Sequence, residues 1–214
     1  MKIGIFGGTF DPPHIGHLIA AQDAADALRL DRLLFVPAGS PPHKRERVIT
    51  PAPLRLEMLQ AALIDEPRFQ VCDLELRREG PSFTADTLRE LNRVHPGDEL
   101  YLLLGADQVR DLPSWHQPEE VARLARIVLI SRSGIDAAPN VEPMIFSTVR
   151  ITRIDVSASE IRQRVANRRS IRYLVPRAVE SIIYEHGLYL NASATGLRPQ
   201  VAVPDGDAKP GVAS

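Results

Sequence analysis

Short apolar runs alternate along this chain with longer segments in which apolar residues recur every three or four positions. The short runs are typical of buried strands, and the longer segments are typical of helices that pack with one face. Strands that alternate with helices indicate parallel strands whose crossover helices cover both faces of a sheet. We therefore expect an α/β fold, a doubly wound, Rossmann-like parallel sheet in a single domain.

The expected strands are residues 3–6, 33–36, 69–76, 100–104, 127–130 and 151–155. The expected helices are residues 15–30, 50–63, a segment that opens near residue 84, and residues 121–125, 159–166 and 176–186. Thr50 is expected to cap the second helix, with Pro51 at its first position. We expect an exposed loop over residues 134–143, and we interpret Cys72 as a small core or strand residue.

The length of 214 residues allows one domain with a sizeable core, and a second full domain would be cramped. The segment after residue 190 is rich in Gly, Pro, Ala and Ser and has little periodicity. We therefore expect one domain over residues 1–190 and a disordered tail over residues 191–214.

The charge balance of 26 Lys and Arg against 27 Asp and Glu provides no general basic field for nucleic acid. No apolar run approaches the roughly 20 residues of a transmembrane helix, and the N-terminus lacks a signal-peptide pattern. The single cysteine excludes an intramolecular disulfide and a multi-cysteine zinc site. We expect a cytoplasmic protein without nucleic-acid or membrane partners, and the sequence leaves the oligomeric state open.

The stretch GGTFDPPHIGH, residues 7–17, joins the first expected strand to the first expected helix. Glycines let backbone N–H groups approach a phosphate, and a helix N-terminus favours negative charge. Ligands of open α/β sheets also bind at the carboxyl ends of strands. The pattern is neither GxGxxG nor GxxxxGK[ST], which disfavours a dehydrogenase and a P-loop kinase.

His14 and His17 are three residues apart on the first helical turn, so their side chains share a face. They could bind zinc, but no third ligand stands at helical spacing and there is no HExxH pattern. They could also be a coincidence of the helix start, or both could donate to phosphate oxygens. We favour the phosphate interpretation, with no metal site.

The pattern G-[GT]-T-F-D-P-x-H-x-G-H resembles the signature of the HxGH nucleotidyltransferase superfamily. HIGH also occurs in class I aminoacyl-tRNA synthetases, but this chain has no KMSKS-type loop and no room for a tRNA-binding domain. Within the superfamily, residues 1 to about 190 most resemble bacterial nicotinate mononucleotide adenylyltransferases. That resemblance is carried by PPHK (41–44), SFTADTL (82–88), LGADQ with LPSWHQPEEV (104–121), and VSASEIR (156–162).

The resemblance implies transfer of AMP from ATP to nicotinate mononucleotide, giving nicotinate adenine dinucleotide and pyrophosphate in NAD biosynthesis. It implies ATP as a substrate that carries Mg²⁺ with it. The attacking phosphate oxygen is already an anion, so neither a general base nor a covalent intermediate is required. Catalysis then consists of aligning two polyanions and neutralising the charge of the departing pyrophosphate.

The resemblance also implies roles for individual residues. The implied catalytic residues are His14, His17, Lys44 and Arg162. The implied ATP-binding residues are Gly7, Gly8, Thr9, Phe10, His14, His17, Gly105, Asp107, Ser157, Ser159 and Arg162. The implied mononucleotide-binding residues are Thr84, Trp115, His43 and Lys44. Ala158 and Ser159 stand where the family usually has Ser and Thr, which could weaken ATP binding, although Ser159 keeps a hydroxyl able to cap the helix.

Two of these residues concern the pyridine end of the mononucleotide, and one of them, Thr84, favours its acid form. Trp115, the only tryptophan, lies in a polar loop, which favours a ring-stacking role, and the resemblance implies that it stacks on the pyridine. Thr84 opens a helix, whose end favours a carboxylate over a neutral amide. Plainer interpretations remain open: Thr84 and Asp107 could be N-caps, Arg162 a solvated helix residue, and Lys44 part of a plain basic loop.

Two alternative functions also remain. One is another HxGH nucleotidyltransferase, a phosphopantetheine adenylyltransferase or a cytidylyltransferase, which would share the histidines but not SFTADTL together with PSWHQPEEV. The other is a nucleotide-binding module without turnover, for which Ala158 is the only indication.

Overall fold

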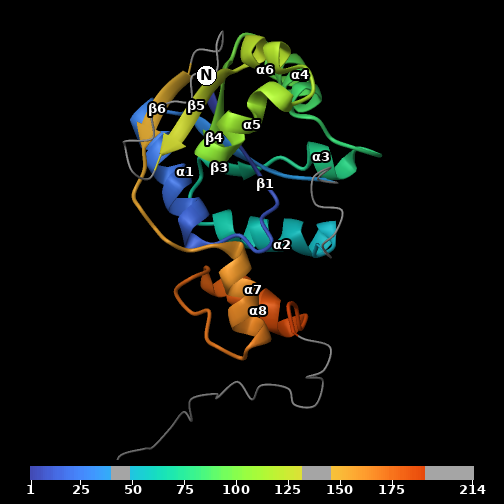
Figure 1. Ribbon diagram of the computed structural model, residues 1–214, viewed down its shortest axis with the longest axis vertical. Coiled ribbons are helices and arrows are strands. Elements are labelled where there is room, and N and C mark those ends of the chain that lie inside the picture. The colour runs from blue at the N-terminus through green and yellow to red at the C-terminus, as the bar shows by residue number, and fades with distance from the viewer. Residues whose placement is uncertain (40–48, 132–145, 191–214) are drawn as a thin grey trace, which may run out of the picture.

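The computed structural model describes residues 1–39, 49–131 and 146–190, apart from the side chain of residue 146. These residues form one sheet of six parallel strands in the order β3-β2-β1-β4-β5-β6 (Figure 1). This order is that of the doubly wound dinucleotide-binding folds. The expected fold class is therefore confirmed, as is the single domain. The segments 134–143 and 191–214, for which a loop and a tail are expected, lie outside the described residues.

The strands are β1 (Lys2–Gly8), β2 (Arg32–Pro37), β3 (Phe69–Val71), β4 (Glu99–Gly105), β5 (Arg126–Ser131) and β6 (Phe146–Arg150). The helices are α1 (Ile15–Leu28), α2 (Ala52–Leu63), α3 (Leu74–Arg77), α4 (Thr84–Val94), α5 (Ala106–Asp111), η1 (Leu112–Ser114), α6 (Pro118–Leu124), α7 (Ala158–Ala166) and α8 (Arg177–Glu185). None of the helices in this part of the chain is long and apolar enough to cross a membrane.

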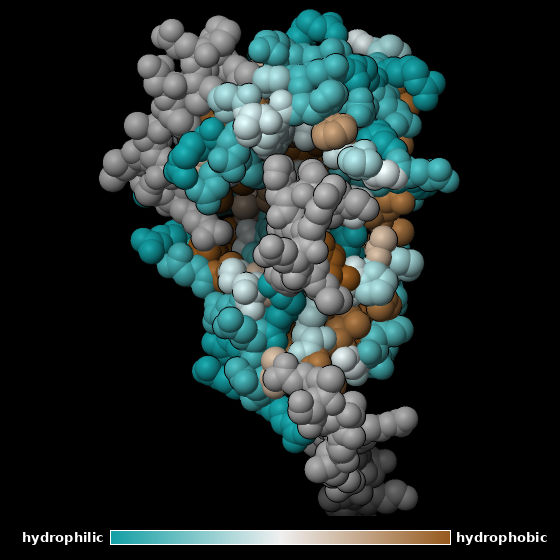
Figure 2. All heavy atoms as spheres, turned by 45° about the vertical axis from the view of Figure 1, so that its right-hand side comes forward, coloured by the Kyte–Doolittle hydropathy of each residue, from teal (hydrophilic) through white to brown (hydrophobic). Residues whose placement is uncertain are grey.

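Alternation of side chains along each strand supplies both faces of the sheet with apolar residues. Phe6 of β1 packs in a core with α1 and α2, whereas its neighbour Ile5 packs in a core with α4, α5 and α6. A third core joins α7 and α8 to Met58 of α2, and these two helices lie below the sheet in Figure 1. The face of the molecule shown in Figure 2 is mostly polar, and apolar residues show there in smaller patches between polar ones.

Two expected strands differ from the structure. Residues 69–76 are not one strand, because β3 ends at Val71 and the chain turns into α3. An apolar run this short cannot be assigned to strand or helix by periodicity alone. Residues 151–155 are not a strand either: β6 ends at Arg150, and Ile151 adds one further backbone bond, to the Ser131 carbonyl.

The expected start of α2 is also wrong. The helix begins at Ala52, so Pro51 occupies the N-cap position and Thr50 lies outside the helix. Thr50 is held instead by two side chains, because its carbonyl accepts a hydrogen bond from Arg55 and its N–H donates to Asp11. Cys72 is half-buried against the α4 side of the sheet, just after β3, as expected of a small core residue.

Candidate functional site

The carboxyl ends of β1 and β4 lie side by side at the point where the order of strand connections reverses. Gly7 and Gly8 end β1, and Gly105 ends β4. Ligands of open α/β sheets bind in the crevice outside such a reversal point. A ligand-binding site is therefore expected among the residues that follow β1 and β4.

His14 and His17 are packed ring against ring at the start of α1. Their ring centroids are 3.6 Å apart with an interplanar angle of 22°. The His14 backbone N–H donates to Nδ1 of His17 over 3.2 Å. Since Nδ1 accepts this bond, the neutral His17 ring carries its proton on Nε2, which becomes a hydrogen-bond donor.

Close packing explains two of the glycines around these rings. A Cβ on Gly16 would lie 3.1 Å from two atoms of the His14 ring, and a Cβ on Gly8 would lie 2.9 Å from the Phe10 ring. Phe10 itself has a left-handed backbone (φ 49°) and a buried ring, 5.1 Å from the ring of His17. Because this ring is enclosed, Phe10 can reach a nucleotide only through its backbone.

The VSASEIR motif lies against the same turn. The carbonyl of Val156 is 3.6 Å from where a Gly16 Cβ would be, and Nη1 of Arg162 donates to the Asp11 carbonyl over 2.6 Å. Ser157 caps α7, because its hydroxyl accepts from the Glu160 N–H over 3.1 Å. The expectation that Ser159 caps this helix is therefore wrong, since Ser159 is its second residue.

At the end of β4, Gly105 is the N-cap of α5 and its N–H donates to Oε1 of Gln108 over 3.1 Å. Asp107 is the second residue of α5, so it is not the N-cap that the alternative interpretation required. Its side chain is 90% exposed and pairs with Arg110 over 3.1 Å. The carboxylate is thus at the surface, within reach of a ligand from solvent.

Thr84 and Trp115 come from elements that pack against each other. The ring of Phe83, next to Thr84, lies 4.5 Å from the ring of His116, next to Trp115. Phe83 is the N-cap of α4, so Thr84 is the first helical residue and not a cap. Trp115 is half-buried against the α4 side of the sheet. His43 and Lys44, the other residues expected here, lie outside the described residues.

Two groups of residues lie at the carboxyl edge of the sheet, where the strands end. We call the first group the histidine half: it consists of the β1–α1 loop (residues 9–14), His17 and Arg162. Phe83, Thr84, Trp115 and His116 form the tryptophan half. The tryptophan half is braced by Arg89 of α4, whose Nε donates to Glu120 of α6 over 2.9 Å and whose guanidinium also contacts Gln117.

Three residues were not expected from the sequence to take part: Asp11, which belongs to the histidine half, and Arg55 and Tyr189, which contact it. Arg55 of α2 is 2% exposed, and Nη1 donates to the Thr9 carbonyl over 3.0 Å. Asp11 is 3% exposed, and Oδ1 accepts from the Tyr189 hydroxyl over 2.7 Å. Burial lowers the pKa of Arg55, and the Asp11 carboxylate opposes that effect. Of the three, only Arg55 could have been recognised from the sequence, as a charged residue within the apolar face of the helix expected over residues 50–63.

The chemistry of the histidine half suits an anion. Imidazole, guanidinium and backbone N–H groups are donors, whereas the carboxylate of Asp11 already accepts from Tyr189. No group of three or more His, Cys, Asp or Glu able to hold a metal ion occurs among residues 1–39, 49–131 and 146–190.

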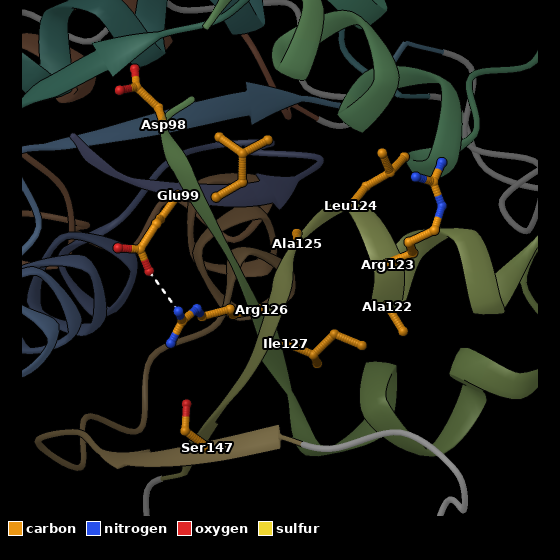
Figure 3. A pocket seen from close by; sticks show the side chains of 10 residues that line it. Asp98, Glu99, Ala122, Arg123, Leu124, Ala125, Arg126, Ile127 and Ser147 are labelled. Atoms are coloured by element: carbon orange, nitrogen blue, oxygen red, sulfur yellow. Dashed lines mark ion pairs between the residues drawn. The ribbon is translucent and has the colours of Figure 1, made fainter. Parts of the chain in front are cut away.

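A separate hollow of about 500 Å³ lies at the opposite edge of the sheet, near the amino ends of β4 and β5 (Figure 3). An ion pair of 2.8 Å between Glu99 and Arg126 crosses one part of it. This edge carries none of the residues to which the sequence assigns a role.

Comparisons with known proteins show the family to which the chain belongs. Residues 5–164 match the sequence model of the cytidylyltransferase-like family. The chain is 47% identical over 191 residues to a protein of Thermus thermophilus named "Probable nicotinate-nucleotide adenylyltransferase", covering 88% of this chain and 100% of that protein. A protein of Geobacillus thermodenitrificans with the same name is 47% identical over 188 residues, covering 88% of this chain and 86% of that protein.

Solved structures of other proteins have a fold similar to that of this chain. The Plasmodium falciparum nicotinic acid mononucleotide adenylyltransferase complexed with NaAD matches with a TM-score of 0.73 at 20% identity, over 88% of this chain and 97% of that chain. The same enzyme complexed with APC matches with a TM-score of 0.71, also at 20% identity, over 88% and 96%. At 20% identity these structures show a similar fold only, and the family assignment rests on the family model and the sequence relatives. The chain belongs to the cytidylyltransferase-like family and, within it, to the nicotinate-nucleotide adenylyltransferases.

Proposed function

We propose that the carboxyl edge of the sheet, from the histidine half to the tryptophan half, is where this nicotinate-nucleotide adenylyltransferase joins its substrates. The reaction transfers AMP from ATP to nicotinate mononucleotide and releases pyrophosphate. The observation that carries the assignment is the bond from the His14 N–H to His17, which leaves Nε2 of His17 as a donor in the histidine half.

In this proposal an oxygen of the mononucleotide 5′-phosphate attacks the α-phosphorus of ATP, and the bond from that phosphorus to the pyrophosphate oxygen breaks. No proton has to move, because the attacking oxygen is already ionised. The protein contributes alignment and charge compensation. His14 and His17 donate to the phosphates of ATP, and Gly7, Gly8, Thr9 and Phe10 add backbone or hydroxyl donors at the end of β1.

Arg162 and Lys44 are proposed to meet the departing pyrophosphate. The planar guanidinium of Arg162 suits two phosphate oxygens, and its bond to the Asp11 carbonyl holds it beside the β1–α1 loop. Ser157 and Ser159 are proposed to add hydroxyls at the start of α7. Gly105 and Asp107 are proposed to bind the nucleoside part of ATP, with the exposed Asp107 carboxylate accepting from ribose hydroxyls.

Mg²⁺ is proposed to enter with ATP, bound to phosphate oxygens and water, where it would supply additional positive charge. Asp11 is the one residue of the histidine half with a carboxylate, and that carboxylate already accepts from Tyr189, so no residue of the histidine half is proposed as a ligand of Mg²⁺. The cytoplasm, where ATP is formed and used, is the proposed site of the reaction.

Selection of the acid mononucleotide is proposed for the tryptophan half. The first N–H groups of a helix have no intrahelical acceptor, and they favour an anion. Thr84 is the first residue of α4, so the pyridine carboxylate would meet its N–H and hydroxyl. The indole of Trp115 would stack on the pyridinium ring, with additional cation–π attraction. His43 and Lys44 are proposed to contribute from the segment that precedes Thr50.

The test is pyrophosphate release from ATP with nicotinate mononucleotide, nicotinamide mononucleotide and phosphopantetheine in turn. We expect release with the acid mononucleotide, a lower kcat/KM with the amide, and none with phosphopantetheine. Equal kcat/KM for acid and amide would overturn the role of Thr84. ATP binding without release from any acceptor would overturn the proposed reaction in favour of a binding module.

A further inference from the structure

Arg55 is a charged side chain enclosed within the protein, directly behind the β1–α1 loop. It is 2% exposed, and it lies on α2 three and four residues before the core residues Met58 and Leu59. Enclosing a guanidinium is costly unless its donors are satisfied. An apolar residue at this position would avoid that cost, so the contacts of Arg55 need an explanation.

The guanidinium joins two segments that are distant in the sequence. Nη1 donates to the Thr9 carbonyl and Nε donates to the Thr50 carbonyl, each over 3.0 Å. The planar group presents these donors in a fixed fork, so the two carbonyls are held at a defined separation. A lysine has the charge but not the fork.

Asp11 belongs to the same hydrogen-bond network, because it also bonds to Thr50. Its carboxylate accepts from the Tyr189 hydroxyl over 2.7 Å and from the Thr50 N–H over 3.4 Å. Its backbone carbonyl accepts from Arg162 over 2.6 Å. Thr50 is thus bonded through its carbonyl to Arg55 and through its N–H to Asp11.

This network holds the Thr9–Asp11 segment. That segment contacts His17 and Arg162, the two side chains proposed to bind the phosphates. Thr9 is bonded to Arg55, and Asp11 is bonded to Arg162. Phe10 lies between them in the chain, and its ring contacts the ring of His17. A shift of this segment would therefore displace His17 and Arg162 together.

We propose that Arg55 is a positioning residue for adenylyl transfer, which holds the Thr9–Asp11 segment so that His17 and Arg162 point at the phosphates. It acts through the Thr9 and Thr50 carbonyls and touches no substrate. This inference rests on the proposed roles of His17 and Arg162. Loss of Arg55 should lower the rate of transfer more than it weakens substrate binding, because misplaced donors act chiefly in the transition state.

The test compares Arg55→Met, Arg55→Lys and a control, Arg68→Met. Arg68 suits the control because it forms its ion pairs at the surface, with Asp26 and Glu66. Circular dichroism gives the folded fraction, and kcat and both KM values are measured on that fraction. We expect kcat of Arg55→Met to fall by about 10- to 100-fold, with both KM values changed far less.

Arg55→Lys should recover part of the lost kcat, whereas Arg68→Met should keep that of the wild type. ¹⁵N NMR of the histidine side chains should show a changed His17 signal in Arg55→Met and an unchanged one in Arg68→Met. If Arg55→Met does not fold, a kcat of Arg55→Lys below the wild-type value at unchanged KM still supports the proposal.

Wild-type kcat in a folded Arg55 variant would overturn the proposal, and so would a loss of activity that only follows the folded fraction. Failure of the proposed function is distinguishable, because it would appear in the wild-type protein as absent pyrophosphate release.

Discussion

The histidine half and the tryptophan half of the edge differ in how their polar groups are held. In the histidine half, His14 and Asp11, with Arg55 beneath them, are almost fully buried. Asp11 and Arg55 are held by side-chain hydrogen bonds, and His14 is held by its backbone N–H bond to His17 and by ring stacking. In the tryptophan half, Trp115 and Phe83 are half-buried. There the bracing comes from ion pairs of Arg89 with partly exposed carboxylates.

This difference matches what each half is proposed to do. Charge that develops on phosphate oxygens is stabilised best by donors that are fixed before the reaction begins. A stacked ring tolerates small displacements, since its attraction depends on overlap and burial more than on one direction. The enclosed network is therefore in the half proposed to bind the phosphates, and the more exposed Trp115 is in the half proposed to bind the pyridine.

The sharpest test of the histidine half is His17→Ala. We expect the fold to remain and kcat to fall by about 10² to 10³, the typical cost of losing one charge-stabilising donor. Steady-state pyrophosphate release measures the effect. His186→Ala, at the exposed C-cap of α8, is the control for loss of a histidine outside the histidine half and should keep its activity. Near-normal turnover of His17→Ala would remove His17 from the mechanism.

The matching test of the tryptophan half is Trp115→Ala. Loss of a stacking ring should raise KM for nicotinate mononucleotide by about tenfold or more, while KM for ATP stays near its wild-type value. Tyr173→Ala, at a ring 83% exposed on the C-terminal part of the domain, is the control for loss of an aromatic side chain. A lower Tm with unchanged KM would mark Trp115 as a core residue.

Gly16→Ala tests how tightly the histidine rings are placed. The new methyl group would lie 3.1 Å from the His14 ring, so the ring has to move by a few tenths of an ångström. Since a misplacement of about 1 Å can cost about 10² in rate, we expect kcat to fall by about tenfold. Alanine is the better helix former, so Tm should not fall. A lower Tm with normal kcat would contradict this explanation of the glycine.

The smallest expected effect concerns Glu75, half-buried near the start of α4, where it accepts a hydrogen bond from the Thr87 hydroxyl over 3.0 Å. Burial raises the pKa of its carboxyl group. The folded protein then binds this proton more tightly than the unfolded chain, so stability falls as pH rises from the unfolded pKa through the folded one.

Glu75→Gln removes that titration, so its Tm should increase relative to the wild type as the pH is raised through that range. Thermal melts at several pH values measure this change. The exposed Glu79→Gln is the control on the same segment. A Tm difference that does not change with pH would show that ionisation of Glu75 is not the cause.

Much of the fold could be predicted because its signals are local. Residues 3–6 and 100–104 are unbroken apolar runs, and the helix that opens at Thr84 has Leu88 and Leu91 on its buried face. The predictions of strands and helix caps were wrong where the local sequence is compatible with more than one structure. The run from residue 69 divides into β3 and α3, and Ser157 rather than Ser159 caps α7, although both residues have a hydroxyl.

The sequence by itself determined the α/β class and singled out the residues proposed as donors in the histidine half, because periodicity and the HxGH turn lie within short stretches of chain. Only the tertiary structure decided how these donors are held. Arg55 is 46 residues from Thr9, and Tyr189 is 178 residues from Asp11, so no local pattern connects them. Such pairs meet only when α2, α7 and the chain after α8 have packed together. The physical reason is that backbone preferences act over a few residues, whereas buried charges are partnered by whatever the packed core brings near.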